Sequence, residues 1–170
     1  SSTPQKIKVK RDQIPLETVE SEMLDNKIGK IRLSNFAEKT AEDFAEHLSQ
    51  LENEGIEGLI IDVRGNPGGY LKAVEDISSQ LVPEGEPILW IEDRNGEKKA
   101  TKSKMNGKKP YPIVVLIDRG SASASEILAA ALQEAGGYTL VGEPTFGKGT
   151  VQTTTDFKDH SNLKYTIAKW

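Results

Sequence analysis

The fold is decided by the stretch GLIIDVRGNPGGYLKAVEDISSQL, which runs from Gly58 to Leu81. Its first six residues are nearly continuously apolar, which is typical of a β-strand buried on both of its faces. Glycine, asparagine and proline dominate residues 64–69, so a turn should follow the strand. From Tyr70 onward, apolar residues recur at helical spacing. The stretch therefore predicts a strand, a glycine-rich turn and a helix, in that order.

Two further strand-and-helix units flank this one. Downstream, residues 112–118 predict a second buried strand, and residues 120–125 lead into a helix that ends at Gly136-Gly137. Upstream, a strand over 28–33 is followed by a helix that begins at Thr40, whose hydroxyl can act as an N-cap, and ends at Gly55. Three such alternations predict an α/β fold with helices packed on the faces of a sheet.

The rest of the chain is rich in short strand patterns. Asn95-Gly96 suits a two-residue hairpin between strands near 88–91 and 97–101, and the lysine-rich residues 98–109 predict a solvated loop. Further strands are expected at 138–141, 149–157 and 162–170, so the chain should end in an antiparallel, β-rich portion. An alternating pattern from Lys6 to Arg11 predicts a short edge strand or linker.

Composition excludes several classes of protein. The 170 residues have the length of one domain, and they contain no cysteine and two histidines, which excludes disulfides, thiolate zinc sites and a cysteine nucleophile. A net charge of -4 argues against a nucleic-acid surface. The longest apolar run, Ile113 to Ile117, is far shorter than the ~20 residues of a membrane-spanning helix. We therefore expect a soluble piece that does not insert into a membrane.

The segment GSASASE at residues 120–126 could carry a nucleophile. Ser123 would lie at a helix start, where the backbone amide of Ala124 could stabilise a developing negative charge and so form half of an oxyanion hole. The same residues fit a capping box, in which Ser123 and Glu126 only satisfy free helix amides. A Ser-His-Asp triad is not favoured, because His47 and His160 are expected at the surface.

The segment TFGKGTVQ at residues 145–152 could supply a base. A lysine amine accepts a proton only when it is uncharged, which requires burial to lower its pKa from ~10.4. The glycines beside Lys148 permit close approach, Phe146 and Val151 can exclude water, and an extended chain would put Gln152 on the same side as Lys148. The alternative is an ordinary lysine in a turn beside a strand glutamine.

Two glycine-rich loops each permit more than one interpretation. Residues 142–148 satisfy the first part of a nucleotide-binding loop, but Gly149 replaces the Ser or Thr that binds magnesium and a β-rich segment follows. The turn at 64–69 lies where open α/β sheets bind ligands, so its amides could complete an oxyanion hole with Ala124. It could also be only a tight turn with positive φ.

Together and in this order, the glycine turn, the serine segment and the lysine segment resemble the C-terminal processing proteases, also called tail-specific proteases. The resemblance implies a ClpP/crotonase-like protease core with an antiparallel β-rich end. It implies that Ser123 is the nucleophile, Lys148 the general base and Gln152 the residue that orients the base. Gly68 or Gly69, with Ala124, would bind the oxyanion. Neither a metal nor a cofactor is implied.

The resemblance also carries expectations about the parent protein. Residues 1–27 would be a linker with a strand remaining from the region after a PDZ domain, and residues 28–170 would be a protease core truncated at its C-terminal end. The parent would act on polypeptide substrates, carry the PDZ domain and work outside the cytoplasm, whether membrane-tethered, periplasmic or secreted. A homodimer of the parent is compatible with this. The alternative function is a catalytically impaired fragment that serves as a binding or scaffold module.

Overall fold

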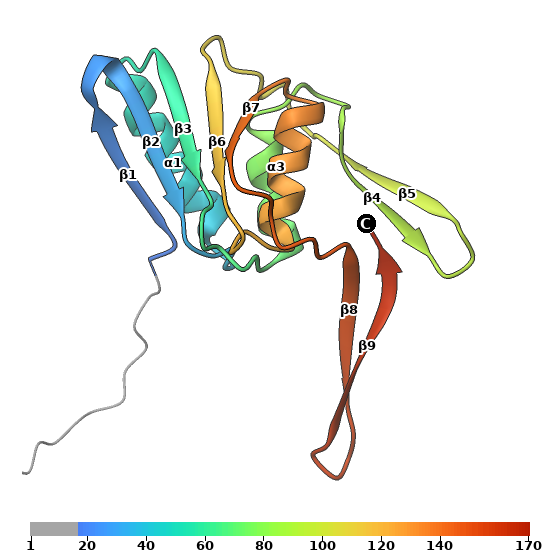
Figure 1. Ribbon diagram of the computed structural model, residues 1–170. Coiled ribbons are helices and arrows are strands. Elements are labelled where there is room, and N and C mark those ends of the chain that lie inside the picture. The colour runs from blue at the N-terminus through green and yellow to red at the C-terminus, as the bar shows by residue number, and fades with distance from the viewer. Residues whose placement is uncertain (1–16) are drawn as a thin grey trace, which may run out of the picture.

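The computed structural model describes residues 17–170, which form two β-sheets and three α-helices (Figure 1). The first sheet has five strands in the order β1-β2-β3-β6-β7. Their bounds are Val19–Leu24, Ile28–Leu33, Gly58–Asp62, Ile113–Ile117 and Thr139–Gly142. Strands β2, β3, β6 and β7 are parallel, and β1 pairs antiparallel with β2 after a short 3-10 turn at Asp25–Lys27.

The three helices connect the parallel strands. They are α1 (Thr40–Asn53), α2 (Leu71–Ser79) and α3 (Ala124–Glu134). The chain crosses the sheet in one direction, from β2 through β3 and β6 to β7, and parallel crossovers are right-handed, so all three helices belong on one face. Accordingly, α2 packs against both α1 and α3.

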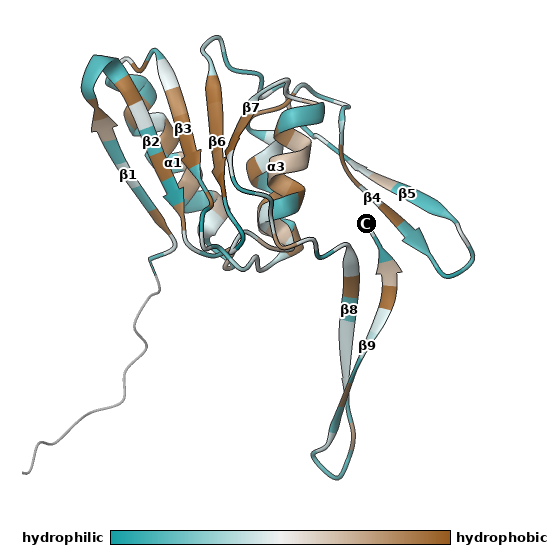
Figure 2. Cartoon of the chain, in the orientation of Figure 1, coloured by the Kyte–Doolittle hydropathy of each residue, from teal (hydrophilic) through white to brown (hydrophobic). Residues whose placement is uncertain are grey.

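The core lies between this helical layer and the sheet. Leu59 and Ile61 of β3 point into it and are buried, as are Ile113 and Val115 of β6, and Figure 2 shows these strands as strongly hydrophobic. Ile60, which points to the other face, is only half-buried. Gly58 and Asp62, on the same face as Ile60, are buried, so the second face of this strand is largely buried although no helix among the described residues covers it.

The second sheet has four antiparallel strands in the order β5-β4-β9-β8. Their bounds are Pro87–Asp93 for β4, Lys98–Lys102 for β5, Thr150–Asp156 for β8 and Asn162–Lys169 for β9. The β8–β9 hairpin projects from the body of the protein (Figure 1). Strand β4 contacts α3, and this contact joins the second sheet to the helical layer of the first.

The predicted fold class is confirmed, and the structure differs from the sequence pattern in local detail. Strand β1 has no counterpart in the prediction, whereas the strand predicted from Lys6 to Arg11 lies outside the described residues. Thr40 is the first residue of α1 and not its cap, since its hydroxyl binds the backbone N–H of Ala37 and the Thr18 hydroxyl. The strand predicted near 97–101 is β5 (Lys98–Lys102), so the loop predicted over 98–109 begins only after Lys102. The loops that follow β3 and β6 build the candidate site.

The turn between β4 and β5 also differs from the expected two-residue hairpin. Gly96 has a positive φ of 80°, but Asn95 does not. Asp93 instead organises the turn, because its Oδ1 accepts the N–H groups of Asn95 and Glu97.

None of the helices within residues 17–170 has the length and apolar character needed to cross a bilayer.

Candidate active site

Ser123 lies at the turn between β6 and α3 in a strained backbone conformation. Its φ of 55° and ψ of -115° are unusual for a residue with a side chain, and such conformations cost about 1–3 kcal/mol and are concentrated at functional sites. The capping box is present: the Ser123 N–H donates to Glu126 Oε2 at 2.7 Å, and the Ser123 side chain faces the Glu126 N–H. That N–H also reaches the Ser123 carbonyl oxygen at 2.9 Å, so the cap does not depend on the hydroxyl alone.

Glu126 joins the serine turn to the lysine segment. Its Oε2 accepts the N–H of Ser123 and, at 3.0 Å, the N–H of Lys148. Its Oε1 accepts the Thr145 hydroxyl at 2.7 Å and the Gly147 N–H at 2.6 Å. One carboxylate oxygen therefore ties the backbone of Ser123 directly to that of Lys148.

The electrostatics of Glu126 follow from this arrangement. Burial alone would raise the pKa of the carboxyl, but the hydrogen bonds from Thr145, Gly147, Ser123 and Lys148 together hold the pKa of Glu126 below its usual value. The carboxylate is therefore ionised at neutral pH, and its four bonds are charge-assisted.

The lysine segment differs in detail from the sequence expectation. Phe146 is 70% exposed, so the prediction that it shields the amine is wrong, and Lys148 is half-buried. Gly147 has a φ of 88°, and an added Cβ would meet no atom within 4 Å, so this glycine serves the backbone conformation rather than close approach. Gly149 is likewise not crowded, its nearest neighbour being the carbonyl oxygen of Trp170.

The glycine-rich turn packs against the serine turn through Asn66. This fully buried residue donates from its side-chain amide to the Leu33 carbonyl and accepts the Gly68 N–H at 2.9 Å. Its own carbonyl oxygen accepts the Ala122 N–H and the Ser125 hydroxyl. A Cβ added to Gly68 would lie 2.8 Å from the Ser123 Cβ, so the two turns are in contact and only glycine fits.

These bonds narrow the choice of oxyanion donors. The Gly68 N–H is already bound to Asn66, whereas within residues 17–170 the amides of Gly69 and Ala124 have no protein acceptor. Gly69 and Ala124 both line the pocket that contains Ser123. Of the residues expected to bind an oxyanion, Gly69 and Ala124 are therefore available and Gly68 is not.

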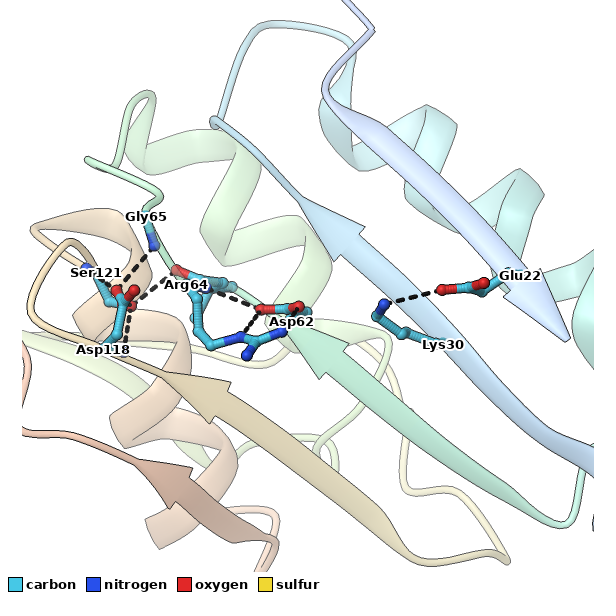
Figure 3. Close-up of polar contacts among 8 residues, drawn as sticks. Glu22, Lys30, Asp62, Arg64, Gly65, Asp118 and Ser121 are labelled. Carbon is cyan, nitrogen blue, oxygen red and sulfur yellow. Dashed lines mark hydrogen bonds and ion pairs between the residues drawn. The ribbon is translucent and has the colours of Figure 1, made fainter. Parts of the chain in front are cut away.

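Two carboxylates at the ends of β3 and β6 fix the turns on which the site depends (Figure 3). Asp62 is buried and accepts the Arg64 guanidinium at 2.9 and 2.6 Å. Asp118 accepts the N–H groups of Gly65, Gly120 and Ser121, and these bonds, that of Gly65 foremost, lower the pKa of the Asp118 carboxyl. The glycine turn is thereby joined to the serine turn on a second side.

A pocket of about 260 Å³ brings the candidate residues together. Its lining comprises Gly69, Leu71, Leu89, Ser123, Ala124, Ile127, Lys148, Thr150, Val151, Gln152, Lys164 and Trp170. Lys148, Thr150 and Gln152 are all among them. Val151 lines the pocket as well, beside a shift in the pairing register at which Ile167 of β9 has no partner on β8.

Within the described part of the chain, no hydrogen bond joins Ser123 Oγ to Lys148 Nζ, or Lys148 to the Gln152 side chain. The three side chains line one pocket, and catalytic hydrogen bonds are often long in active sites without substrate and tighten when substrate binds. The other two serines of the segment are structural: the Ser121 hydroxyl donates to the Val63 carbonyl, and the Ser125 hydroxyl to the Asn66 carbonyl. Neither His47 nor His160 lines the pocket.

The structure excludes one interpretation of the lysine segment and adds two residues to the site. A nucleotide-binding loop requires a helix after its lysine, but strand β8 follows Lys148, so that interpretation is wrong. From the sequence, Glu126 is recognised only as half of a capping box, and Asn66 is not singled out. The capping box itself could have identified Glu126, since a carboxylate there has further lone pairs to offer.

The sequence and the fold are similar to those of known proteases. The profile of Peptidase family S41 matches residues 27–170. Two curated relatives from Bacillus subtilis are similar over 96% of this chain: carboxy-terminal processing protease CtpB at 53% identity and CtpA at 46%. The chain spans 35% of the length of each. Among solved structures, the photosystem II D1 C-terminal processing protease superposes with a TM-score of 0.81 at 30% identity, covering 94% of this chain and 45% of that one.

Proposed function

The chain belongs to peptidase family S41, and on that premise we propose that it is the core of a serine endopeptidase of the C-terminal processing type. In this proposal Ser123 is the nucleophile, Lys148 is the general base and Gln152 orients the lysine amine. The observation that carries the proposal is that Ser123, Lys148, Gln152, Gly69 and Ala124 line a single pocket.

The proposed reaction has two halves. Lys148 Nζ, uncharged when it reacts, takes the proton of the Ser123 hydroxyl as Oγ attacks the carbonyl carbon of a peptide bond. The resulting oxyanion is stabilised by the free N–H groups of Gly69 and Ala124. Lys148 then gives the proton to the leaving amine, the C–N bond breaks, and an acyl-enzyme remains. Lys148 Nζ then takes a proton from a water molecule whose oxygen attacks the ester carbonyl; the C–O bond to Ser123 breaks, the acid product leaves, and Lys148 returns the proton to Ser123 Oγ.

Several contacts support this assignment. The Ser123 conformation is strained and directs a side chain toward the pocket from a helix start, where backbone amides favour negative charge. Glu126 Oε2 fixes the spacing between the backbones of Ser123 and Lys148. The Gly68 N–H is bound to Asn66, and Gly69, whose N–H has no acceptor among the described residues, lines the pocket.

The test is cleavage of an unfolded polypeptide or an internally quenched peptide by this chain and by its Ser123→Ala variant. The proposal predicts that the variant retains the fold, by circular dichroism, and loses turnover by a factor of about 10⁴ or more. Ser125→Ala is the matched control on the same turn, and it should retain cleavage provided that it folds. Equal turnover by the chain and by Ser123→Ala would contradict the proposal and favour a binding or scaffold module.

A further inference from the structure

The pocket that contains Ser123 has a cation for which the proposed reaction has no use. Lys164 of β9 lines this pocket together with Ser123 and Lys148. It pairs across the hairpin with Thr154, and the next pair on the same face is Gln152 with Thr166. Lys164 is therefore the diagonal neighbour of Gln152, at a separation that a long side chain can bridge.

Lys164 has no anionic partner within residues 17–170. The ion pairs there use other lysines, namely Lys27, Lys30, Lys72, Lys98 and Lys109. Asp156 lies on the same face of the hairpin, two residues beyond Thr154, yet forms no ion pair with Lys164 within 4 Å. No Asp or Glu lines the pocket. The pocket thus presents the positive charge of Lys164 to whatever enters it.

The pocket also has apolar lining, formed by Leu71, Leu89, Ile127 and Trp170. An anionic group is unfavourable against those apolar side chains and favourable beside the lysine. A peptide bound in the pocket therefore meets apolar side chains over α3 and β4 and a cation over the β8–β9 hairpin.

We propose that Lys164 is a specificity residue that binds a carboxylate of the peptide substrate, either an acidic side chain or the free C-terminal carboxylate. The inference rests on the proposed function, because it takes the occupant of the pocket to be a peptide. Lys164 is exposed, so the interaction has the strength of an exposed ion pair and should change affinity by about two- to fivefold.

Binding can be measured without chemistry in the Ser123→Ala background, by fluorescence anisotropy of three labelled peptides of alanine and leucine. One peptide is neutral with an amidated C-terminus, the second has a free C-terminal carboxylate, and the third is amidated and carries one glutamate. The expected result is that the second or the third binds about two- to fivefold more tightly than the neutral peptide, and which one does so identifies the source of the carboxylate. The preference should disappear in 1 M salt, where charges are screened within about 3 Å.

The decisive comparison is between variants in that background. Lys164→Met should reduce the ratio of the affinity for the preferred carboxylate peptide to that for the neutral peptide to about one. Lys164→Arg should retain the preference. Lys158→Met, which removes a charge from the turn of the same hairpin, should leave the ratio unchanged. The proposal would be overturned if the preference survived Lys164→Met, if the Ser123→Ala protein with its native Lys164 showed no preference, or if no peptide bound. Labelling of Ser123 by a fluorophosphonate in the chain with its native serine reports separately on the proposed function.

Discussion

At Glu126, one carboxylate accepts four hydrogen bonds from two segments of the chain. The bonds from Ser123 and Lys148 fix the two proposed catalytic positions relative to each other, and those from Thr145 and Gly147 hold the loop between them. A charged acceptor in this position stabilises the loop and the helix start together.

Glu126→Gln should make the stability of the protein less dependent on pH. Because the pKa of Glu126 is lowered on folding, its contribution is fully present above the ordinary value of 4.5 and is lost as the pH falls through the lowered pKa. We expect the variant to lose about 2 kcal/mol of unfolding free energy at pH 7 and progressively less below pH 4.5. Urea titrations from about pH 7 to about pH 3 measure this.

The control for that experiment is Glu134→Gln, an exposed glutamate at the other end of α3. It should change the unfolding free energy by no more than a few tenths of a kcal/mol at any of these pH values. A Glu126→Gln variant with the same pH dependence as the unmodified protein would show that the four bonds contribute no net stability.

Among the structural elements, the glycine turn matters because it closes against the start of α3. Gly68 has a φ of 104°, and a Cβ there would lie 2.8 Å from both the Ala122 carbonyl oxygen and the Ser123 Cβ. Gly65, in the same turn, has a φ of 70° but nothing within 4 Å of an added Cβ. A side chain at either glycine would strain the backbone, but only one at Gly68 would also displace the serine turn.

Gly68→Ala should reduce the rate at which a fluorophosphonate labels the protein by about 100-fold, since a shift of about 1 Å in a reacting group has an effect of that size. Gly65→Ala should cost about 1–2 kcal/mol of stability from its left-handed conformation and leave the labelling rate unchanged. Intact-protein mass spectrometry over time gives both rates. Equal rates in the two variants would mean that the contact of Gly68 with the serine turn is unimportant for reactivity.

In the molecule as a whole, Trp170 links the second sheet to the body that carries Ser123. The backbone N–H of Trp170 donates to the Gly149 carbonyl at 3.1 Å. The Trp170 side chain packs against the core, and the residue lines the pocket. Trp170→Ala should therefore speed hydrogen exchange at the amides of β8 and β9 by about tenfold or more, while β3 and β6 keep their protection.

Trp90→Ala is the comparison for that measurement, since Trp90 lies in the same sheet but is 53% exposed. It should leave the exchange of β8 and β9 close to that of the unmodified protein. Uniform acceleration across both sheets in Trp170→Ala would instead indicate that the two sheets unfold as one cooperative unit.

Much of this architecture follows from local sequence patterns. The strand at 28–33 and the helix units after residues 58 and 113 have strong apolar periodicity and clear glycine boundaries, so their bounds are predicted within about two residues. Strand β1 has no such signal, because VESEML carries three polar residues and becomes a strand only by pairing with β2. Tertiary pairing of this kind overrides local propensity.

The candidate site is predictable in its residues but not in its contacts. The resemblance of the serine and lysine segments to the C-terminal processing proteases implies Ser123 and Lys148 as site residues, and a buried strand before each turn predicts that the turns meet at one edge of the sheet. The exposure of Phe146, the use of the Gly68 amide by Asn66 and the bridging role of Glu126 depend on how loops far apart in sequence pack together. No periodicity in the sequence encodes those contacts.

The central claim is that Lys148 activates Ser123, and the most direct measurement is covalent labelling by a fluorophosphonate followed by peptide mapping of the modified residue. The chain should be labelled at Ser123, and Lys148→Ala should be labelled about 100-fold more slowly or worse while its circular dichroism spectrum is retained. Lys158→Ala, on the β8–β9 turn, should react at the unmodified rate. Labelling of a different serine, or equal rates in Lys148→Ala and the unmodified chain, would contradict the account.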